Sequence, residues 1–216
     1  MFKLFIQNWI ERWYNFLPNR RRIQFLILAF FILFATFYLN NKCSAYADKV
    51  QGATLHDLLL DHIIVRDVNF IFFWIALCWC LCMFIYHIIY PKQMANLVWT
   101  YALFIAIRAI FITLTHMGPP SNLEQIPTAL KFYAFSADMF FSGHVGGPFL
   151  LALLTTNFRY RILALIYTGI IIIIVLLGHM HYSIDVFASL FIAHSIAEIS
   201  KKLKHVLDPI IFKTHV

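Results

Sequence analysis

Two short strings of the sequence combine residue types that suit phosphoryl-transfer chemistry. The string FFSGHVGG spans residues 140–147, and the string GHMHYSIDV spans residues 178–186. The first contains His144, and the second contains His181 four residues before Asp185. Two imidazoles and a carboxylate supply a nucleophile, a general acid or base, and a group that orients the nucleophile.

His181 and Asp185 are predicted to act as a pair. Residues four apart share one face of a helix, so the carboxylate can accept a hydrogen bond from one imidazole nitrogen. That bond fixes the tautomer and leaves the other nitrogen free to attack phosphorus. His144 is then the predicted acid that protonates the leaving oxygen. A lone histidine is more often a packing residue, but ionisable groups that share one membrane depth favour catalysis.

A phosphate-binding role is predicted for the residues around the first string. Ser142 and Gly143 open a glycine-rich stretch, where the free N–H groups of a helix N-terminus suit a phosphate oxygen. The alternative for Ser142 is a plain helix cap. Arg108 is expected at similar depth, where it either clamps a phosphate or pairs with Asp138. Asp138, otherwise a cap or a solvated loop residue, and Tyr182 complete the predicted substrate-binding set.

No metal and no cofactor are expected. His179 and His181 have the spacing of a ligand pair in a strand, but on a helix they point apart. Cys78, Cys80 and Cys82 lie two residues apart in an apolar run, so a helix turns them to different faces as well.

The composition predicts a membrane protein. Hydrophobic residues make up 62% of the chain and charged residues 12%, whereas a soluble domain has about a quarter charged residues. The apolar stretches predict an all-α bundle of six transmembrane helices. They cover residues 23–39, 68–90, 94–114, 141–156, 160–178 and 182–199, and the fourth is short and contains glycines.

The chain divides into three predicted parts, which are an amphipathic cytoplasmic segment (1–22), a six-helix catalytic domain (23–200) and a basic cytoplasmic tail (201–216). Of the seventeen Lys and Arg residues, twelve fall in the segments assigned to the inner side and four in the outer loops. This bias predicts that both termini are cytoplasmic and that the two strings lie near the outer or luminal face. The net charge of +7 forms no stripe with base-stacking aromatics, so nucleic acid is not an expected partner.

Two further predictions concern the end of the first span and the two outer loops. Ala45-Tyr46-Ala47 resembles a signal-cleavage site, but the apolar stretch before it is long, which favours an uncleaved first span. The outer loop at 40–67 is predicted to contain a short interfacial helix at 55–60. The outer loop at 115–139 contains three prolines and is predicted to be irregular.

Together the motifs resemble the sphingomyelin synthase-like branch of the type 2 phosphatidic acid phosphatase superfamily. The resemblance rests on SGH, on HYSID, on IRAIFITLTHMGPP at 107–120 and on ATLHDLLLDHIIVRDVNFIF at 53–72. It covers roughly residues 50–200, and the two histidine strings are specific only in combination.

The resemblance implies that His181 is the nucleophile, that Asp185 orients it and that His144 completes the triad. It implies transfer of a phospho-headgroup from a glycerophospholipid to ceramide or diacylglycerol, through a phosphohistidine and without a metal. Membrane lipids are therefore the expected partners. One departure is Val145, because the family usually has threonine after SGH, and this bears on the substrate or the rate.

Two other functions stay open. A lipid phosphatase or phospholipase C-like hydrolase of the same superfamily would use water as the acceptor. The phosphatase branch resembles a pattern with Arg-Pro upstream and Ser-Arg before the nucleophile, whereas this chain lacks Arg-Pro and has Ile174-Val175 at the second position. A phosphomonoester dianion also needs more cations than Arg108, which favours a diester. The third function is a non-catalytic lipid-binding or transport protein.

Overall fold

The computed structural model describes residues 2–18, 20–120 and 138–211. Within these ranges the chain forms seven α-helices, one short 3₁₀ helix and no strand. The helices are α1 (Phe2–Tyr14), α2 (Arg20–Lys49), η1 (Leu60–His62), α3 (Asn69–Ile89), α4 (Pro91–Leu114), α5 (Gly143–Leu154), α6 (Phe158–Leu177) and α7 (Ser183–Ile211).

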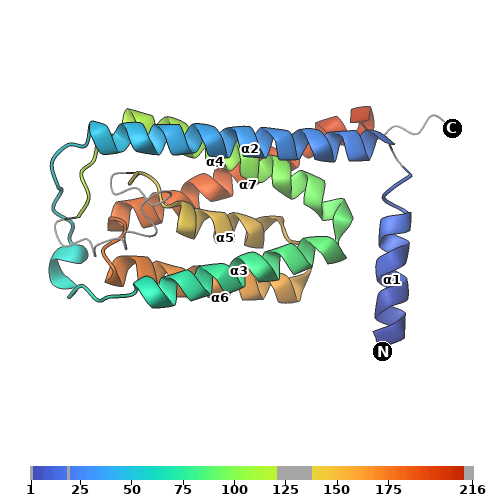
Figure 1. Cartoon of the computed structure of the whole chain (residues 1–216), viewed down its shortest axis with the longest axis horizontal. Helices are drawn as coiled ribbons and strands as arrows, with labels where there is room; N and C mark the ends of the chain where they lie inside the picture. The colour runs from blue at the N-terminus through green and yellow to red at the C-terminus, as the bar shows by residue number, and fades with distance from the viewer. Residues whose placement is uncertain (1, 19, 121–137, 212–216) are drawn as a thin grey trace.

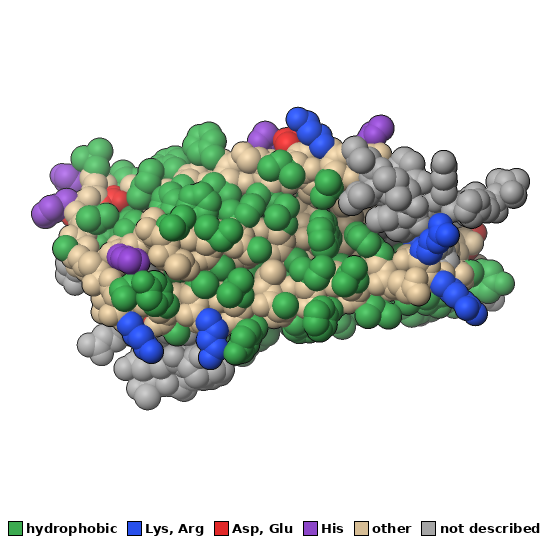
Figure 2. All heavy atoms as spheres, turned by 90° about the horizontal axis from the view of Figure 1, so that it is seen from above, with side chains coloured by type: hydrophobic (Ala, Val, Ile, Leu, Met, Phe, Trp, Pro, Cys, Tyr) green, Lys and Arg blue, Asp and Glu red, His purple; other side chains and the backbone are tan. Residues whose placement is uncertain are grey.

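The helices form a membrane-spanning bundle, which confirms the predicted fold class. Among the described residues, α2, α3, α4, α6 and α7 are long and apolar enough to cross a membrane, and α5 is a shorter apolar helix. In the most apolar windows of α2 and α3, only 6% of the residues are buried in the protein. Hydrophobic side chains cover much of the face shown in Figure 2. A surface of this kind needs lipid as its solvent, so the chain is an integral membrane protein.

The short helix α5 lies at the centre of the bundle (Figure 1). Figure 1 shows α2 lying along α4 and α3 lying along α6, with α5 between these two pairs. Helix α5 packs most closely on α6 and α7, and seven of its twelve residues are buried. Twelve residues are about 18 Å of helix, well below the bilayer thickness. The N-terminus of α5 therefore starts inside the protein, facing the turn between α6 and α7.

Two apolar cores hold α5 in this position. One core joins Phe104 of α4, Leu150 of α5 and Ile196 of α7. The other joins Val145 of α5 to Val175 of α6 and to residues at the starts of α3 and α7. Because both cores surround α5, the direction of its first turn is fixed by packing on several sides.

Helix α2 is longer than the first span predicted from sequence. The predicted stretch ended at residue 39, but α2 continues to Lys49. Residues 40–49 contain no proline or glycine, and Ser44 and Ala47 are buried within the bundle. Polar residues after the apolar run therefore continue the helix because they find partners inside the protein. Helix α7 also extends past the predicted residue 199, to Ile211.

The short helix predicted at 55–60 is wrong in position and type. The structure has instead one 3₁₀ turn, η1, over Leu60–His62. The carboxylate of Asp57 accepts hydrogen bonds from the N–H groups of Leu59 and Leu60, at 2.9 and 3.1 Å. A side chain that binds the amides two and three residues ahead favours a turn over a continuing helix.

Helix α1 is attached to the end of the bundle opposite η1. The indole N–H groups of Trp9 and Trp13 both donate to the carbonyl of Ile88, at 2.9 and 2.8 Å. Arg12 donates to the carbonyl of Ile89 at 3.2 Å and lies over the ring of Tyr90. These contacts satisfy carbonyls that the C-terminus of α3 leaves without partners.

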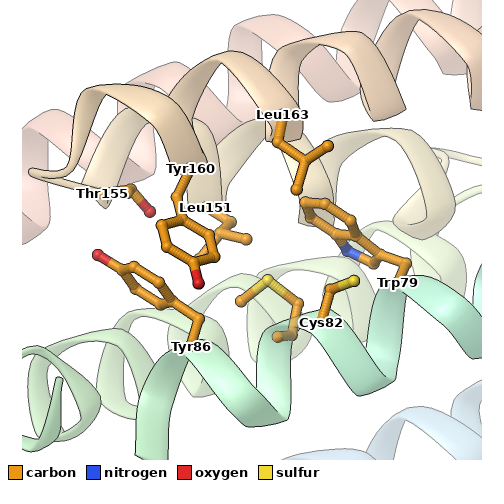
Figure 3. A pocket seen from close by; sticks show the side chains of 8 residues that line it. Trp79, Cys82, Tyr86, Leu151, Thr155, Tyr160 and Leu163 are labelled. Atoms are coloured by element: carbon orange, nitrogen blue, oxygen red, sulfur yellow. The ribbon is translucent and has the colours of Figure 1, made fainter. Parts of the chain in front are cut away.

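A small, mostly apolar pocket lies between α3, α5 and α6, away from the two histidine strings (Figure 3). The residues lining it are Trp79, Cys82, Met83, Tyr86, Leu151, Thr155, Tyr160 and Leu163. It contains none of the predicted site residues. His144 and His181 lie instead at the start of α5 and just before α7.

Candidate active site

The structure brings the two histidines of the separate strings close together. His144 lies in the first turn of α5, and His181 lies in the turn that precedes α7. Their ring centroids are 6.1 Å apart. The edge of the His144 ring also contacts Phe72 of α3, with ring centroids 4.9 Å apart. His144 is exposed, whereas His181 is only 3% exposed.

His181 and Asp185 approach one another, but not as two residues on one helix face. Helix α7 begins at Ser183, so His181 lies in the preceding turn. His181 Nδ1 is 3.5 Å from Asp185 Oδ2, longer than an ordinary N–H···O hydrogen bond. Asp185 is completely buried. A proton on Nδ1 would face this carboxylate and leave the lone pair on Nε2.

Asp185 also starts the helix on which it lies. Its Oδ2 accepts a hydrogen bond from the backbone N–H of Tyr182 at 3.0 Å. This is the returning half of a capping box, in which the third helical residue binds the amide just before the helix. The same carboxylate therefore caps the N-terminus of α7 and faces the imidazole of His181. This cap explains why the helix begins after His181.

Buried polar atoms without a partner concentrate at this site. Among the described residues, five buried side-chain N or O atoms make no hydrogen bond, and three of them are Ser142 Oγ, His181 Nδ1 and Asp185 Oδ1. Such an atom costs about 1–3 kcal/mol. A cluster of them therefore marks a site whose partners come from elsewhere, such as a substrate.

Ser142 is the residue before α5, but its side chain does not cap the helix. Its N–H donates to the carbonyl of Asp185 at 3.2 Å, which joins the starts of α5 and α7 directly. The hydroxyl is fully buried and has no partner among the described residues. The first N–H groups of any α-helix also lack intrahelical acceptors. Both features make the start of α5 suitable for a phosphate oxygen.

Arg108 forms the ion pair with Asp138 that was one of its two predicted roles. Its Nη2 lies 3.1 Å from Asp138 Oδ2 and 3.0 Å from the Asp138 carbonyl oxygen. Its Nε donates to the carbonyl of Phe141 at 3.1 Å, and the residue is 6% exposed. Arg108 thus holds the segment 138–141 that leads into Ser142. A direct contact between Arg108 and a substrate remains a prediction.

Gly143 lies directly against this arginine. A Cβ atom at Gly143 would be 3.0 Å from Arg108 Nε and 3.3 Å from its Cδ. The glycine therefore lets the guanidinium lie beside the first turn of α5. Val145, two residues after Gly143, is fully buried in the core with α6 and α7. Where the family that the sequence resembles usually has threonine, this chain therefore has a valine that packs in the core.

Two residues of α2 belong to this cluster and were missed in the sequence. Asn40 Oδ1 accepts a hydrogen bond from Arg108 Nη1 at 3.3 Å. Ser44 Oγ donates to Asp138 Oδ2 at 3.3 Å. Both were assigned to an outer loop, although their spacing of four residues is the spacing of one helix face.

The hydroxyl of Tyr182 holds the loops that cover this end of the bundle. It donates to the carbonyl of Gly118 at 2.9 Å and accepts from the N–H of Leu55 at 3.0 Å. Tyr182 is 2% exposed. The predicted substrate contact of Tyr182 would therefore have to involve atoms other than this engaged hydroxyl.

His179 has a similar anchoring role. Its φ angle of 49° places it in the left-handed region, which is uncommon for a residue with a side chain. Its Nε2 lies 3.1 Å from the carbonyl oxygen of Ile63, so the ring fixes the loop before α3.

Among the described residues, no group of three or more His, Cys, Asp or Glu is arranged to hold a metal ion.

Asp57 is a further residue that sequence reasoning left without a role. Its carboxylate is 8% exposed and accepts the backbone N–H of Ser183 at 2.7 Å. Burial alone would raise the pKa of Asp57, but hydrogen bonds from Leu60, Ser183 and Leu59 outweigh it and hold the pKa below its ordinary value.

The fold and the site together define an integral membrane protein with a buried His–Asp pair and an exposed second histidine at one end of a helical bundle. Comparisons with protein-family models, with curated proteins and with solved structures found no match for this chain.

Proposed function

We propose that the protein is a sphingomyelin synthase-like lipid phosphotransferase. It moves a phospho-headgroup from a glycerophospholipid to ceramide or diacylglycerol. The observation that carries the proposal is the meeting of His144, His181 and Asp185 beside the N-terminus of α5. The buried hydroxyl of Ser142, which has no partner among the described residues, supports it further because it can donate a hydrogen bond to a phosphate oxygen.

The first half-reaction forms a phosphohistidine. Nε2 of His181 attacks the donor phosphorus, and the bond from phosphorus to the diacylglycerol oxygen breaks. His144 gives its proton to that leaving oxygen. Asp185 orients the attacking ring and stabilises the positive charge that develops on it. The hydroxyl of Ser142 and the first N–H groups of α5 bind the phosphoryl oxygens.

The second half-reaction reverses these roles. His144, now neutral, accepts the proton of the acceptor hydroxyl as that oxygen attacks the phosphohistidine. The bond from phosphorus to His181 breaks, and the histidine is regenerated as the product lipid forms. No net proton is consumed, because the proton given to diacylglycerol is replaced by the proton of the acceptor.

The charge at the site supports a phosphodiester donor. Arg108 lies against Gly143 at the start of α5, and Asp138 balances its charge at a distance of 3.1 Å. A phosphodiester carries one negative charge, whereas a phosphomonoester carries close to two at neutral pH. A site with a neutralised arginine fits the singly charged group better.

A headgroup-transfer assay tests this proposal. Protein in detergent receives fluorescent ceramide or fluorescent diacylglycerol with phosphatidylcholine or phosphatidylethanolamine, and the products are separated by chromatography. We expect a new fluorescent phospholipid. We expect His181→Ala and His144→Ala to lower the rate by about 10²–10⁴-fold. The matched control is His194→Ala, which replaces an exposed histidine of α7 and should leave the rate unchanged.

A labelled donor supplies the mechanistic test. After a quench that avoids acid, which would hydrolyse a phosphohistidine, the phosphoryl label should remain on the wild-type chain but not on His181→Ala protein. His144→Ala protein should acquire the label more slowly than the wild type, because it lacks the acid for the first half-reaction. Full headgroup transfer by His181→Ala protein would refute the mechanism.

The exposure of His144 gives a second candidate function, a phospholipase C-like hydrolase. The protein leaves the ring of His144 uncovered, so the same base could activate a water molecule in place of a lipid hydroxyl. The same assay separates the two candidates. Release of free phosphocholine or phosphoethanolamine, with no new lipid in the presence of an acceptor, would favour the hydrolase.

A further inference from the structure

The carboxylate of Asp57 connects the outer loop to the start of α7. Its Oδ1 accepts the N–H groups of Leu59 and Leu60, and its Oδ2 accepts the N–H of Ser183. The last of these bonds is 2.7 Å long and crosses 126 residues of sequence. Asp57 is therefore attached locally through one oxygen and to α7 through the other.

The point that Asp57 holds lies directly beside the His–Asp pair. Ser183 is the first residue of α7 and follows His181 by two residues. The next amide toward His181, that of Tyr182, is held by Asp185. Two carboxylates from distant parts of the chain thus bind two consecutive amides at the start of α7, and negative groups are favourable at this end of a helix.

We propose that Asp57 is a positioning residue for the catalytic reaction, in that its hydrogen bond to the Ser183 amide sets the distance between His181 and Asp185. This inference rests on the proposed function. Asp57 acts through Ser183 and touches no reacting atom. The geometry of the His181–Asp185 pair thus depends on a carboxylate outside the pair, that of Asp57.

The geometry of the pair explains why a small movement matters. His181 Nδ1 and Asp185 Oδ2 are 3.5 Å apart and make no hydrogen bond at this distance, so the two side chains stay close only while the turn holds its place. A further displacement of the turn would separate them, while a displacement of about 1 Å can cost about 10²-fold in rate. Because Asp185 already binds the Tyr182 amide, the Asp57 bond supplies the additional restraint on the turn.

Two substitutions remove the restraint from opposite sides. Asp57→Ser keeps a hydroxyl that can accept from Leu59 and Leu60, but it is too short to bridge to Ser183. Ser183→Pro removes the donating N–H at the first helical position, where proline is well tolerated. Each variant therefore breaks the bond between the two segments while preserving the local structure on its own side.

Two matched substitutions serve as controls. Ser195→Ala removes an exposed hydroxyl of α7 that binds the carbonyl of Phe191 on the same helix. Asp61→Asn alters a carboxylate of the same loop that pairs with the exposed His56. Neither control removes the bond from Asp57 to the Ser183 amide.

The experiment measures two quantities on each protein in detergent. Steady-state headgroup transfer gives kcat and KM, and hydrogen–deuterium exchange reports the protection of residues 178–186. We expect Asp57→Ser and Ser183→Pro to lower kcat at least tenfold with KM changed less than twofold, and to speed exchange in 178–186. The controls should match the wild type in both. The double variant should be no slower than the single variants, because both remove one bond.

The outcomes are distinct. Faster exchange with an unchanged kcat would show that Asp57 anchors the loop without positioning the pair, and would overturn the inference. Unchanged exchange in both variants would overturn the restraint itself. Equal losses in the Asp61→Asn control would show a general loop effect and would also overturn it. Absence of headgroup transfer in the wild type would instead refute the proposed function, and with it the positioning role of Asp57 in that reaction.

Discussion

Arg108 links three segments of the chain through one guanidinium group. It binds Asn40 of α2, the Asp138 carboxylate and the carbonyl of Phe141, and it lies on α4 itself. Its position in an apolar helix is costly unless every charge is paired. The partners explain why arginine is needed, since lysine lacks the planar fork that reaches several acceptors at once.

The first prediction at this scale concerns the loss of that arginine. Arg108→Met should destabilise the protein by about 3 kcal/mol, because it leaves the Asp138 carboxylate without its buried cation. Thermal unfolding in detergent measures this change. The double variant Arg108→Met/Asp138→Asn should recover part of the loss, because the unpaired charge is gone.

The control for this prediction is Arg66→Met, which changes an exposed arginine of the loop before α3 and should have little effect. If Arg108→Met unfolded at the wild-type temperature, the ion pair would not be holding segment 138–141 in place.

At the scale of the elements, α5 depends on close contacts at its glycines. A Cβ atom at Gly146 would lie 2.8 Å from Cζ of Phe104 and 3.3 Å from Cβ of Ser189. The helix therefore approaches α4 and α7 more closely than any larger residue allows, as small residues do in membrane proteins. In contrast, Gly169 of α6 has no atom within 4 Å of such a Cβ.

This contrast gives a matched pair of substitutions. Gly146→Ala should destabilise the protein and lower headgroup transfer, because the start of α5 must move away from Phe104. Gly169→Ala should raise stability by about 0.5–1 kcal/mol, the usual gain for alanine over glycine within a helix. Thermal unfolding of both variants and the wild type tests the prediction. A stability gain in Gly146→Ala would show that α5 is not closely packed there.

The helices and most of their ends could be predicted from the sequence, because the spans predicted at 68–90, 94–114 and 160–178 end within three residues of α3, α4 and α6. Long apolar runs need internally satisfied backbones in lipid, so each run had to be a helix. The far ends of α2 and α7 could not be predicted, and α2 shows why. It continues past residue 39 because Asn40 and Ser44 find partners on other segments, and the local sequence does not contain those contacts.

Part of the site could also be predicted from the sequence, namely the meeting of its two histidines. His144 and His181 were expected to meet, since the chain crosses the membrane twice between them, and the structure places them together. The contributions of Asn40, Ser44 and Asp57 depend on which helices pack side by side. No spacing in the sequence encodes that packing, so these three residues had no assigned role.

At the scale of the whole molecule, the orientation in the membrane is a prediction that labelling can test. In protein whose four cysteines are replaced by alanine, Leu58→Cys lies at the site end and Arg159→Cys at the opposite end. Both positions are exposed. In intact cells or sealed vesicles, a membrane-impermeant maleimide should label Leu58→Cys from the outer or luminal side. It should reach Arg159→Cys only after permeabilisation.

The reverse labelling pattern would place the site on the cytoplasmic face. The positive-inside bias would then have been misleading for this chain. Equal labelling of both positions before permeabilisation would instead indicate leaky membranes, which a soluble cytoplasmic marker protein detects.

The different exposure of the two histidines has a consequence for inhibition. An electrophile too bulky to pass the loops would meet the accessible ring of His144 first, while His181 stays shielded by its buried position. Alkylation of His144 would block proton transfer yet leave the nucleophile chemically intact. Mass spectrometry of a covalently inhibited protein would therefore find the label on His144, even though the proposed mechanism places the phosphoryl group on His181.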